Sequence, residues 1–523
     1  MTRSYSPKAT WSPPPRGASL AILVAISLGL TSCRDTAAPD ADAATPGLRV
    51  ISGAGVSDTI DARLGNPLIV ELRDSTGRAM PGAVLQVGVA VTAPAYLPNG
   101  VVAKSPAGPF VASYVDTTDA KGRASISVGL GRQAGTTGII VRTADARWQT
   151  EASFTVLPGA PASLTVSPGD TAVYAARTFQ LAAVVRDRGG NLRTETPTYS
   201  TLTSRVLSVS ASGAASTVAV GRGAIRAALG TIADTVNVSS VPPGTIVASA
   251  MYGSSGLSSI RTRVFTVNLD GTGRTEVIAS PYWAEPAPAF SPDGTSLVFP
   301  LGYHDTKLYV ATGSMPPRPF GGAPVTSEGY PRFSRDGQWI YFNGRPGSQN
   351  CAIWRVRRDG GGAEQLSPPI NDYEIDANPD PSPDGTRLAY NTNRLSFAMP
   401  VIRLLDVATR KVTALDVPGV TPRWSPDGSR IAYIPTEPYW GYIDDNRVML
   451  NPGPLTLMRP DGTDRQAIPT GTVGFNPGFA WSPDGKYIVA RSGTGSLAVV
   501  VVATGEVLPL PFSGDLYLPD WKP

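Results

Sequence analysis

Phe290-Ser291-Pro292-Asp293-Gly294 is the stretch that decides the fold, because versions of it return through the C-terminal half of the chain. The serines of its five full copies are Ser291, Ser334, Ser382, Ser425 and Ser482. They are separated by 43, 48, 43 and 57 residues, and a shortened copy stands at 519–523. A period of about 40–50 residues is typical of a β-propeller or another repeat array.

Each copy predicts a turn followed by strands. Proline fixes φ at the second turn position, aspartate is tolerated at the third and glycine suits the fourth, so Ser-Pro-Asp-Gly fits a type I turn. A short apolar strand follows, as at 431–433, and a third strand comes after a variable loop, as at 455–458. With a short fourth strand after a turn such as Asp461-Gly462, each repeat holds the four antiparallel strands of one propeller blade.

The shortened copy holds a first strand only, while three strands precede the first full copy. These strands are expected at 245–248, 264–271 and 275–278. We expect the C-terminal strand to pair with residues 245–279 and to close a ring of six blades. Such closure leaves no exposed sheet edge.

One copy, Trp424 to Tyr433, matches the Trp-Ser-Pro-Asp-Gly phrase and the following apolar-Ala-Phe/Tyr strand of TolB-type propellers. Residues 242–523 resemble that family. The resemblance implies a propeller fold, a place in the cell envelope and a peptidoglycan-associated partner. It does not by itself identify a function, because propellers host many unrelated roles.

The composition favours an all-β protein and excludes several classes of site. The chain has 523 residues, 41% of them hydrophobic, with 55 glycines and 50 prolines placed between short strands. The net charge of +4 comes without a basic block, so nucleic acid is not expected as a partner. A single histidine and two cysteines exclude a multi-histidine metal site and a disulfide scaffold. No metal and no cofactor are expected.

The N-terminus predicts export and lipid anchoring. Ala18 to Leu30 is an apolar run of 13 residues, shorter than the roughly 20 of a membrane-spanning helix. It ends in Leu30-Thr31-Ser32-Cys33, which resembles a bacterial lipobox, so residues 1–33 are interpreted as a lipoprotein signal and Cys33 as the lipidated residue. Ordinary cleavage near 41–43 is the alternative. Residues 34–47 form a flexible tether, and the absence of Asp after Cys33 favours the outer membrane.

Two further domains are expected between the tether and the propeller. Alternating strands separated by turns fill residues 48–157 and again 158–241. The phrases at 74–77 and 118–124 resemble bacterial immunoglobulin-like domains of the invasin/intimin type. Residues 241–244 are expected to form a hinge into the propeller at 242–523. The predicted fold class is therefore all-β, with two immunoglobulin-like sandwiches followed by a six-bladed propeller.

Catalytic signals are weak. There is no Gly-x-Ser-x-Gly nucleophile motif and no glycine-rich phosphate loop between a strand and a helix. His304 is interpreted as a loop residue, the repeated aspartates as turn residues rather than calcium ligands, and Cys351 as a buried free thiol. Trp424, Trp481 and Trp521 recur at one repeat position and are expected to pack between blades. No catalytic residue is assigned.

Loops on one rim of the predicted ring are the candidate ligand-binding site. The loop at 435–451 and the connector at 368–379 depart from the repeat and combine aromatic and acidic side chains, which suit recognition of a protein, a glycan or a cation. Silent loop insertion is the alternative. The candidate residues are Tyr373, Glu374, Asp376, Tyr439, Trp440, Tyr442, Asp444 and Asp445.

These observations predict a non-catalytic envelope lipoprotein, anchored in the outer membrane on its periplasmic or cell-surface side. An immunoglobulin-like stalk would hold a propeller that binds an envelope protein or another envelope component. One alternative is a cell-surface adhesin or glycan-binding protein. A second is a propeller-based lyase or hydrolase, which a single histidine disfavours.

Overall fold

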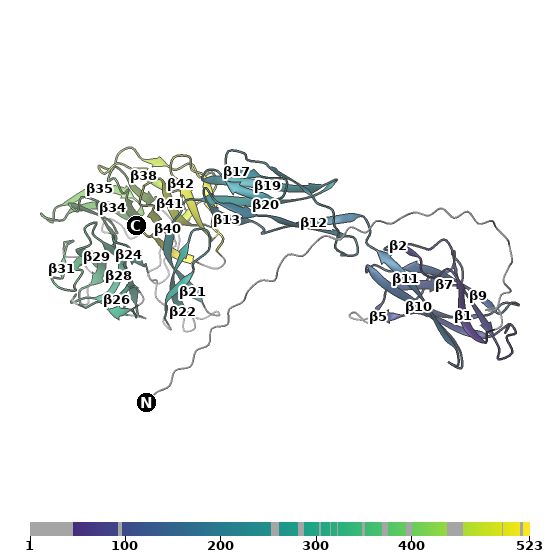
Figure 1. Cartoon of the computed structure of the whole chain (residues 1–523). Helices are drawn as coiled ribbons and strands as arrows, with labels where there is room; N and C mark the ends of the chain where they lie inside the picture. The colour runs from purple at the N-terminus through teal and green to yellow at the C-terminus, as the bar shows by residue number, and fades with distance from the viewer. Residues whose placement is uncertain are drawn as a thin grey trace, which may run out of the picture. The chain divides into compact units, whose positions relative to one another are not determined.

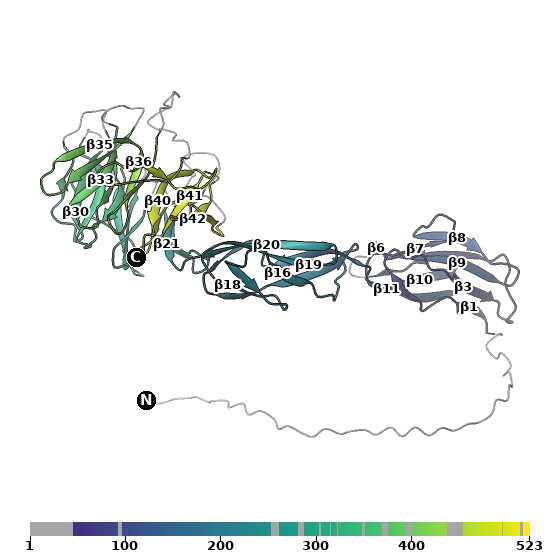
Figure 2. The same cartoon turned by 90° about the horizontal axis from the view of Figure 1, so that it is seen from above.

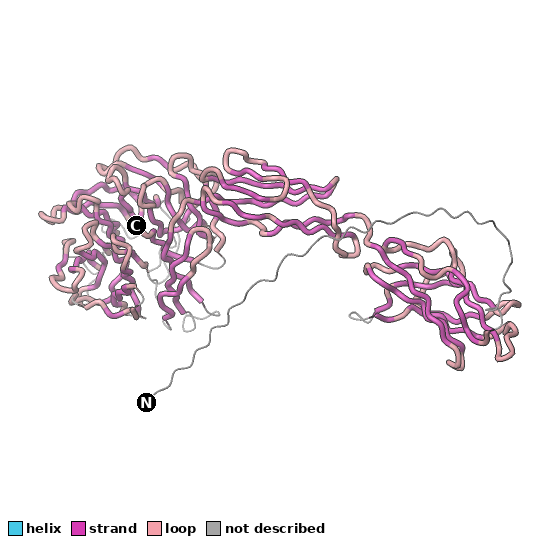
Figure 3. The backbone as a smooth tube through the Cα atoms, viewed as in Figure 1, coloured by secondary structure: helices cyan, strands magenta, loops and turns pink. Residues whose placement is uncertain are grey.

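The computed structural model describes residues 45–92, 97–252, 261–280, 287–302, 305–313, 315–321, 323–347, 351–368, 375–393, 400–436, 453–493, 495–512 and 516–523. These residues form strands, turns and loops, without an α-helix (Figure 3); accordingly, none of them belongs to a helix that could span a membrane. They fall into two compact units that divide near residue 155.

The first unit is built from two β-sheets (Figure 2). In spatial order, one sheet contains β1 (Gly47–Ser52), β3 (Leu68–Arg73), β9 (Arg123–Leu130) and β7 (Gly100–Ala103). The other contains β2 (Ser57–Thr59), β11 (Gln149–Leu157), β10 (Gly135–Thr143), β4 (Val84–Val89) and β8 (Ser113–Thr117). A small ribbon pairs β5 (Val91–Thr92) with β6 (Leu97–Pro98). Alternate side chains such as Val70 and Phe154 are buried, as in a half-buried strand.

A buried carboxylate joins three strands of the first unit. Glu71 is 1% exposed and accepts hydrogen bonds from Arg49 Nη2 at 2.8 Å, Arg73 Nε at 2.8 Å and Arg123 Nε at 3.0 Å. Burial alone would raise the pKa of Glu71, but the three guanidinium groups outweigh it and lower the pKa to about 2. The cluster therefore stabilises the ionised, folded form.

The second unit begins with three small sheets around one core. The first sheet contains β12 (Pro161–Ser167) and β15 (Ala182–Asp187). The second contains, in spatial order, β13 (Thr171–Tyr174), β20 (Ile232–Val241), β19 (Gly221–Leu229) and β16 (Thr198–Thr201). The third contains β14 (Thr178–Gln180), β18 (Ala214–Thr217) and β17 (Leu207–Val209). Residues from all three sheets, including Val166, Leu207 and Val236, share this core. Residues 179–187 and 218–227 each have the pattern of one continuous strand, but neither segment forms one. The chain changes sheet at the buried Leu181, and Val218 to Val220 lie between strands.

The segment expected to be a hinge is instead packed. Val241 is fully buried in a cluster that also holds Ala172 and Leu508 of β43 (Val507–Pro509). The Tyr174 hydroxyl donates to the Gly244 carbonyl at 2.9 Å, and the Arg222 N–H donates to Glu506 Oε1 at 2.6 Å. Residues on both sides of 241–244 thus share one core, which opposes free bending.

The rest of the second unit consists of six four-stranded antiparallel sheets among the described residues (Figure 1). With strands in spatial order, the first sheet contains β23 (Thr275–Ser280), β22 (Arg261–Asn268), β21 (Thr245–Tyr252) and β44 (Leu516–Trp521), and the second contains β24 (Ala289–Phe290), β25 (Ser296–Leu301), β26 (Lys307–Thr312) and β27 (Arg318–Pro319). The third contains β28 (Thr326–Phe333), β29 (Trp339–Arg345), β30 (Ala352–Arg357) and β31 (Glu364–Gln365), and the fourth contains β32 (Asp376–Pro381), β33 (Arg387–Thr392), β34 (Val401–Asp406) and β35 (Val412–Pro418). The fifth contains β36 (Val420–Trp424), β37 (Ile431–Ile434), β38 (Thr456–Met458) and β39 (Gln466–Ala467), and the sixth contains β40 (Phe475–Trp481), β41 (Tyr487–Ser492), β42 (Leu497–Val501) and β43 (Val507–Pro509).

One pairing joins the end of the chain to the start of this region. β44 pairs antiparallel with β21, with Trp521 opposite Ile246 and Leu516 opposite Ala250. The predicted pairing of the C-terminal strand with residues 245–279 is confirmed. Sheets built this way form a β-propeller, and the pairing supplies the innermost strand of the sheet that contains β21.

Every full copy of the repeated phrase forms the same turn. In the copy at 425–430, the Gly428 N–H donates to the Ser425 carbonyl at 2.9 Å, and the Ser425 hydroxyl donates to Asp427 Oδ1 at 2.5 Å. The Arg430 N–H in turn donates to Ser425 Oγ at 2.9 Å. The aspartates therefore serve the turns, as predicted, and their hydrogen bonds lower their pKa values.

Replacing Glu71 by Gln should destabilise the first unit by about 2–3 kcal/mol at pH 7, because the folded-state pKa lies about two units or more below its unfolded value. A depressed carboxylate pKa stabilises the fold above pH 4.5, and the contribution is lost as pH falls toward 2. The gap between wild type and E71Q should accordingly shrink at pH 3. Amide hydrogen exchange of β3 and β9 measures it.

The ion pair of the exposed Lys104 with the partly buried Asp116, 3.3 Å apart, supplies the control. D116N should change exchange by less than about 0.5 kcal/mol. Equal protection of wild type and E71Q at pH 7 would contradict the assignment.

Replacing Ser425 by Ala should destabilise the propeller by about 1–3 kcal/mol in urea unfolding, because the Arg430 N–H loses its buried partner. The matched control is Ser429→Ala, whose exposed hydroxyl also donates to Asp427, at 2.8 Å. S429A should cost less than about 0.5 kcal/mol. Similar losses for both variants would show that the inner hydroxyl has no special role in the turn.

Candidate functional site

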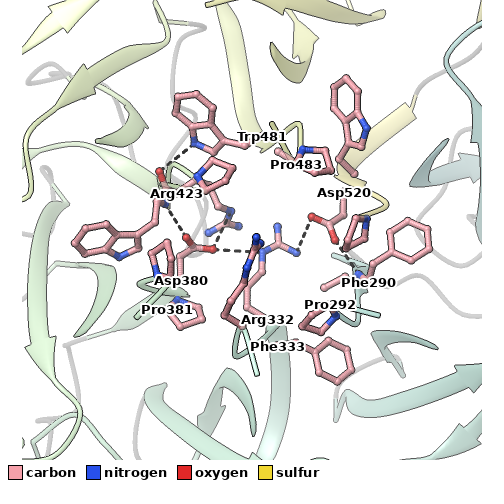
Figure 4. Close-up of a pocket in the computed structure, with 18 of the residues that line it drawn as sticks. Phe290, Pro292, Arg332, Phe333, Asp380, Pro381, Arg423, Trp481, Pro483 and Asp520 are labelled. Atoms are coloured by element: carbon pink, nitrogen blue, oxygen red, sulfur yellow. Dashed lines mark hydrogen bonds and ion pairs between the residues drawn. The ribbon is translucent and has the colours of Figure 1, made fainter. Parts of the chain in front are cut away.

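A pocket opens on the propeller axis at the rim that carries the Ser-Pro-Asp-Gly turns (Figure 4). Its inner wall is made by one repeat position, the residue two before each serine, with Lys522 in the serine place of the shortened copy. In ring order these residues are Ala289, Arg332, Asp380, Arg423, Ala480 and Asp520. The innermost strand of each of the six sheets thus contributes one side chain to the axis.

Backbone bulges set the direction of these side chains. The residue four before the serine place has positive φ in five of the six innermost strands; these are Tyr330 (47°), Asn378 (56°), Thr421 (50°), Gly478 (102°) and Leu518 (48°). The strand register shifts beside each of them. Bulges re-aim side chains and are frequent next to functional sites. Left-handed backbone at four non-glycine residues costs about 1–3 kcal/mol each, so this geometry is held against strain.

Two arginines and two aspartates meet at the axis. Arg332 lies between both acids, with Nε 3.8 Å from Asp380 Oδ1 and Nη1 3.7 Å from Asp520 Oδ1. Arg423 Nε lies 3.9 Å from Asp380 Oδ1. Figure 4 shows these four side chains pointing toward one another. All three separations exceed the 2.7–3.2 Å of a hydrogen bond, so the charges attract without using up the guanidinium donors.

The second carboxylate oxygen of each aspartate accepts a hydrogen bond from the neighbouring sheet. Asp380 Oδ2 accepts the Trp424 N–H at 2.7 Å, and Asp520 Oδ2 accepts the Phe290 N–H at 2.8 Å. Each acid thereby ties its own innermost strand to the next one around the ring. The aspartates hold the ring together as well as balancing charge.

The charged groups of the pocket lie in a poorly solvated environment. Burial raises the pKa of Asp380 and of Asp520, against the pull of the arginines. Burial together with the charge of Arg332 lowers the pKa of Arg423 to about 9. Arg423 is only 5% exposed, and its Nε has no hydrogen-bond partner. A buried guanidinium with a free donor is a costly arrangement unless something else completes it.

The mouth of the pocket is a collar formed by the residue that follows each serine place. Five of the six are prolines, namely Pro292, Pro383, Pro426, Pro483 and Pro523, and the sixth is Arg335. Arg335 is exposed and brings a third positive charge. The cavity has a volume of about 180 Å³. It is therefore smaller than the 300–1,000 Å³ of typical small-molecule sites.

Most of the sequence-predicted site lies outside the described residues. This applies to Cys33, His304, Tyr373, Glu374, Tyr439, Trp440, Tyr442, Asp444 and Asp445. Asp376 is described and is fully buried, and its backbone N–H donates to the Cys351 carbonyl at 2.9 Å. Its side chain is therefore not exposed on the rim in this structure.

Two other predictions can be compared with the structure. Trp424 and Trp521 are 5% and 6% exposed and pack in the cores, as expected of residues between blades. Cys351 is a free thiol, as predicted, and is partly buried. This burial raises the pKa of its thiol.

One sequence signal marks the axial residues. When the repeats are aligned on their serines, the position two before them holds two Arg, two Asp and two Ala. Three of the four charged residues immediately precede a buried aromatic residue, which is unusual for a strand core. Recognising that this position faces an axis requires knowing the bulge, which the repeat spacing does not reveal.

Part of the chain is similar in sequence to a TolB homolog. No protein-family model matches the chain. A 116-residue stretch, 20% of the chain, is 34% identical to 38% of an uncharacterized protein of Agrobacterium fabrum. A 173-residue stretch, 32% of the chain, is 30% identical to 35% of the protein TolB homolog of Chlorobium luteolum. The chain spans little more than a third of the length of either relative.

Among solved structures, TolB from Acinetobacter baumannii is similar at 15% identity with a TM-score of 0.41, covering 58% of this chain and 80% of that one. The sheet topology and the sequence similarity to the TolB homolog together identify a TolB-like β-propeller fold.

Replacing Asp520 by Ala should destabilise the propeller by about 1–3 kcal/mol, because the buried Phe290 N–H loses its acceptor and Arg332 loses a counter-charge. Asp520→Asn keeps an acceptor oxygen and should recover most of the loss. Urea unfolding of both variants separates the hydrogen bond from the charge. If D520A matches wild type, the acid does not tie the two strands together.

Proposed function

We propose that this chain is a non-catalytic, lipid-anchored protein of the cell envelope, whose six-bladed propeller binds a protein partner. Two immunoglobulin-like domains would carry the propeller on a stalk from the acylated Cys33. The similarity to a TolB homolog supports an envelope location and a binding role. The outer membrane, the lipid anchor and the identity of the partner belong to the proposal.

The observation that carries this proposal is the strained, charged pocket on the propeller axis. Five bulges, the buried Arg423 and the largely buried Arg332 are maintained at a cost in stability, which favours a selected binding surface over simple packing. Its small volume suits the insertion of one side chain from a larger partner. The rigid proline collar adds apolar contact area at little loss of conformational entropy.

Site-specific photo-crosslinking in intact envelopes tests the binding role. A photoreactive residue at the exposed Gln338, on the turn rim, should give one dominant protein adduct, identified by mass spectrometry. The matched control is the same photoreactive residue at Thr76, in an exposed turn of the first unit. A form with loop 435–451 shortened tests the opposite rim in parallel.

Loss of the adduct on shortening loop 435–451 would assign binding to the rim favoured by the sequence. Adducts that are identical at Gln338 and Thr76, or absent from both, would overturn the proposal and favour the adhesin or enzyme alternatives.

A further inference from the structure

The guanidinium groups at the axis have more donors than acceptors. A guanidinium carries five N–H donors. For Arg423, the hydrogen bond found is from Nη1 to the Pro422 carbonyl at 2.9 Å, while Nε has no partner. For Arg332, carbonyl contacts of 3.4 and 3.5 Å from Nη1 are long. The nearby carboxylates lie at ion-pair distance rather than at hydrogen-bond distance.

The side chains of the lining also carry a net positive charge. Three arginines, Arg332, Arg335 and Arg423, face two aspartates, so the side chains of the lining sum to 3 − 2 = +1. Arg335 stands where the other copies have proline, at the mouth through which a ligand would enter. Carboxylates match the planar fork of arginine and form the stronger, charge-assisted hydrogen bonds.

We propose that the axial pocket binds the carboxylate of an acidic side chain that a protein partner inserts along the propeller axis. Arg423 and Arg332 would donate to this carboxylate, and Arg335 would attract it at the mouth. Asp380 and Asp520 would position the arginines and keep the empty site from carrying unbalanced buried charge. The inference rests on the proposed binding function and names the group that is recognised.

The size and the walls of the pocket favour a protein side chain as the occupant. A volume of about 180 Å³ accommodates a glutamate or aspartate side chain. The partly exposed prolines of the collar, such as Pro292 and Pro383, offer rigid apolar walls for the methylene groups and the adjoining backbone of such a segment. An acidic sugar ring is larger and presents hydroxyl groups, for which this collar has few partners.

Glutarate is the probe, because it reproduces the end of a glutamate side chain, and neutral glutaramide is its matched control. Calorimetric titration of the full mature chain should show glutarate binding and no binding of glutaramide. Arg423→Gln should weaken glutarate binding by about tenfold or more. Arg335→Pro, which restores the residue of the other copies, should weaken it about two- to fivefold without disturbing the fold.

The Asp380→Asn variant distinguishes a binding role of the cluster from a purely structural one, because the two roles predict different changes in glutarate affinity. Asparagine keeps an acceptor for the Trp424 N–H but removes the competing charge, so D380N should strengthen glutarate binding severalfold. A purely structural role for the cluster predicts that R423Q and D380N both weaken binding or leave it unchanged. Arg459→Gln, which removes an exposed arginine paired with Asp464 at 3.5 Å, should leave binding as in wild type.

Equal binding of glutarate and glutaramide, or unchanged glutarate affinity in both R423Q and R335P, would overturn the carboxylate site. Glucuronate binding more tightly than glutarate would overturn the assignment to a protein side chain in favour of an acidic glycan.

The crosslinking experiment distinguishes failure of the carboxylate site from failure of the proposed binding function. A Gln338 adduct that glutarate does not compete away and that R423Q retains would preserve the binding function and remove this site. Glutarate binding without any adduct would preserve the site and remove the proposed protein partner.

Discussion

The pairing of β44 with β21 is the constraint on which the propeller depends. It brings residues 516–521 beside residues 246–250, across more than half the chain, and places Trp521 in the same core as Ile246 and Leu508. Closing such a separation costs chain entropy, but the cost grows only slowly with length. The buried apolar area and the completed strand ladder offset it. The same pairing also sets the position of Asp520, so ring closure and the axial cluster have a common origin.

Asp520 shows how closure and site formation are coupled. Its backbone belongs to the closing strand, its Oδ2 accepts the N–H of Phe290 in the next sheet, and its Oδ1 faces Arg332 two sheets away. Asp380 makes the equivalent contact to Trp424. Two of the six junctions between neighbouring innermost strands are thus bridged by a carboxylate at the axis. A change in ring geometry would therefore move the charged groups of the pocket.

Much of this fold could be predicted from the sequence, because the relevant signals are local. The Ser-Pro-Asp-Gly turns, the apolar strands after them and the pairing of the final strand all follow from short-range turn chemistry and from counting strands. The errors arose where local pattern and tertiary contact disagree. Leu181 continues an apolar run but marks a change of sheet, and the proline-rich segment at 241–244 has the composition of a hinge but is packed into a shared core.

The axial site could be predicted from the sequence only in part, for a related reason. Loop residues such as Tyr439 and Asp444 are predicted to bind a ligand because they depart from the repeat, whereas the axial residues occupy a regular position inside it. The repeat fixes the backbone of each copy through its turn, so the position two before the serine is free to vary. In this chain that freedom is used for charge, since Arg332, Asp380 and Arg423 stand on three successive innermost strands. Neighbours of opposite sign can hold one another at 3.8–3.9 Å without saturating their hydrogen bonds. A regular scaffold with an irregular charge pattern on its axis can therefore acquire specificity without any change in fold.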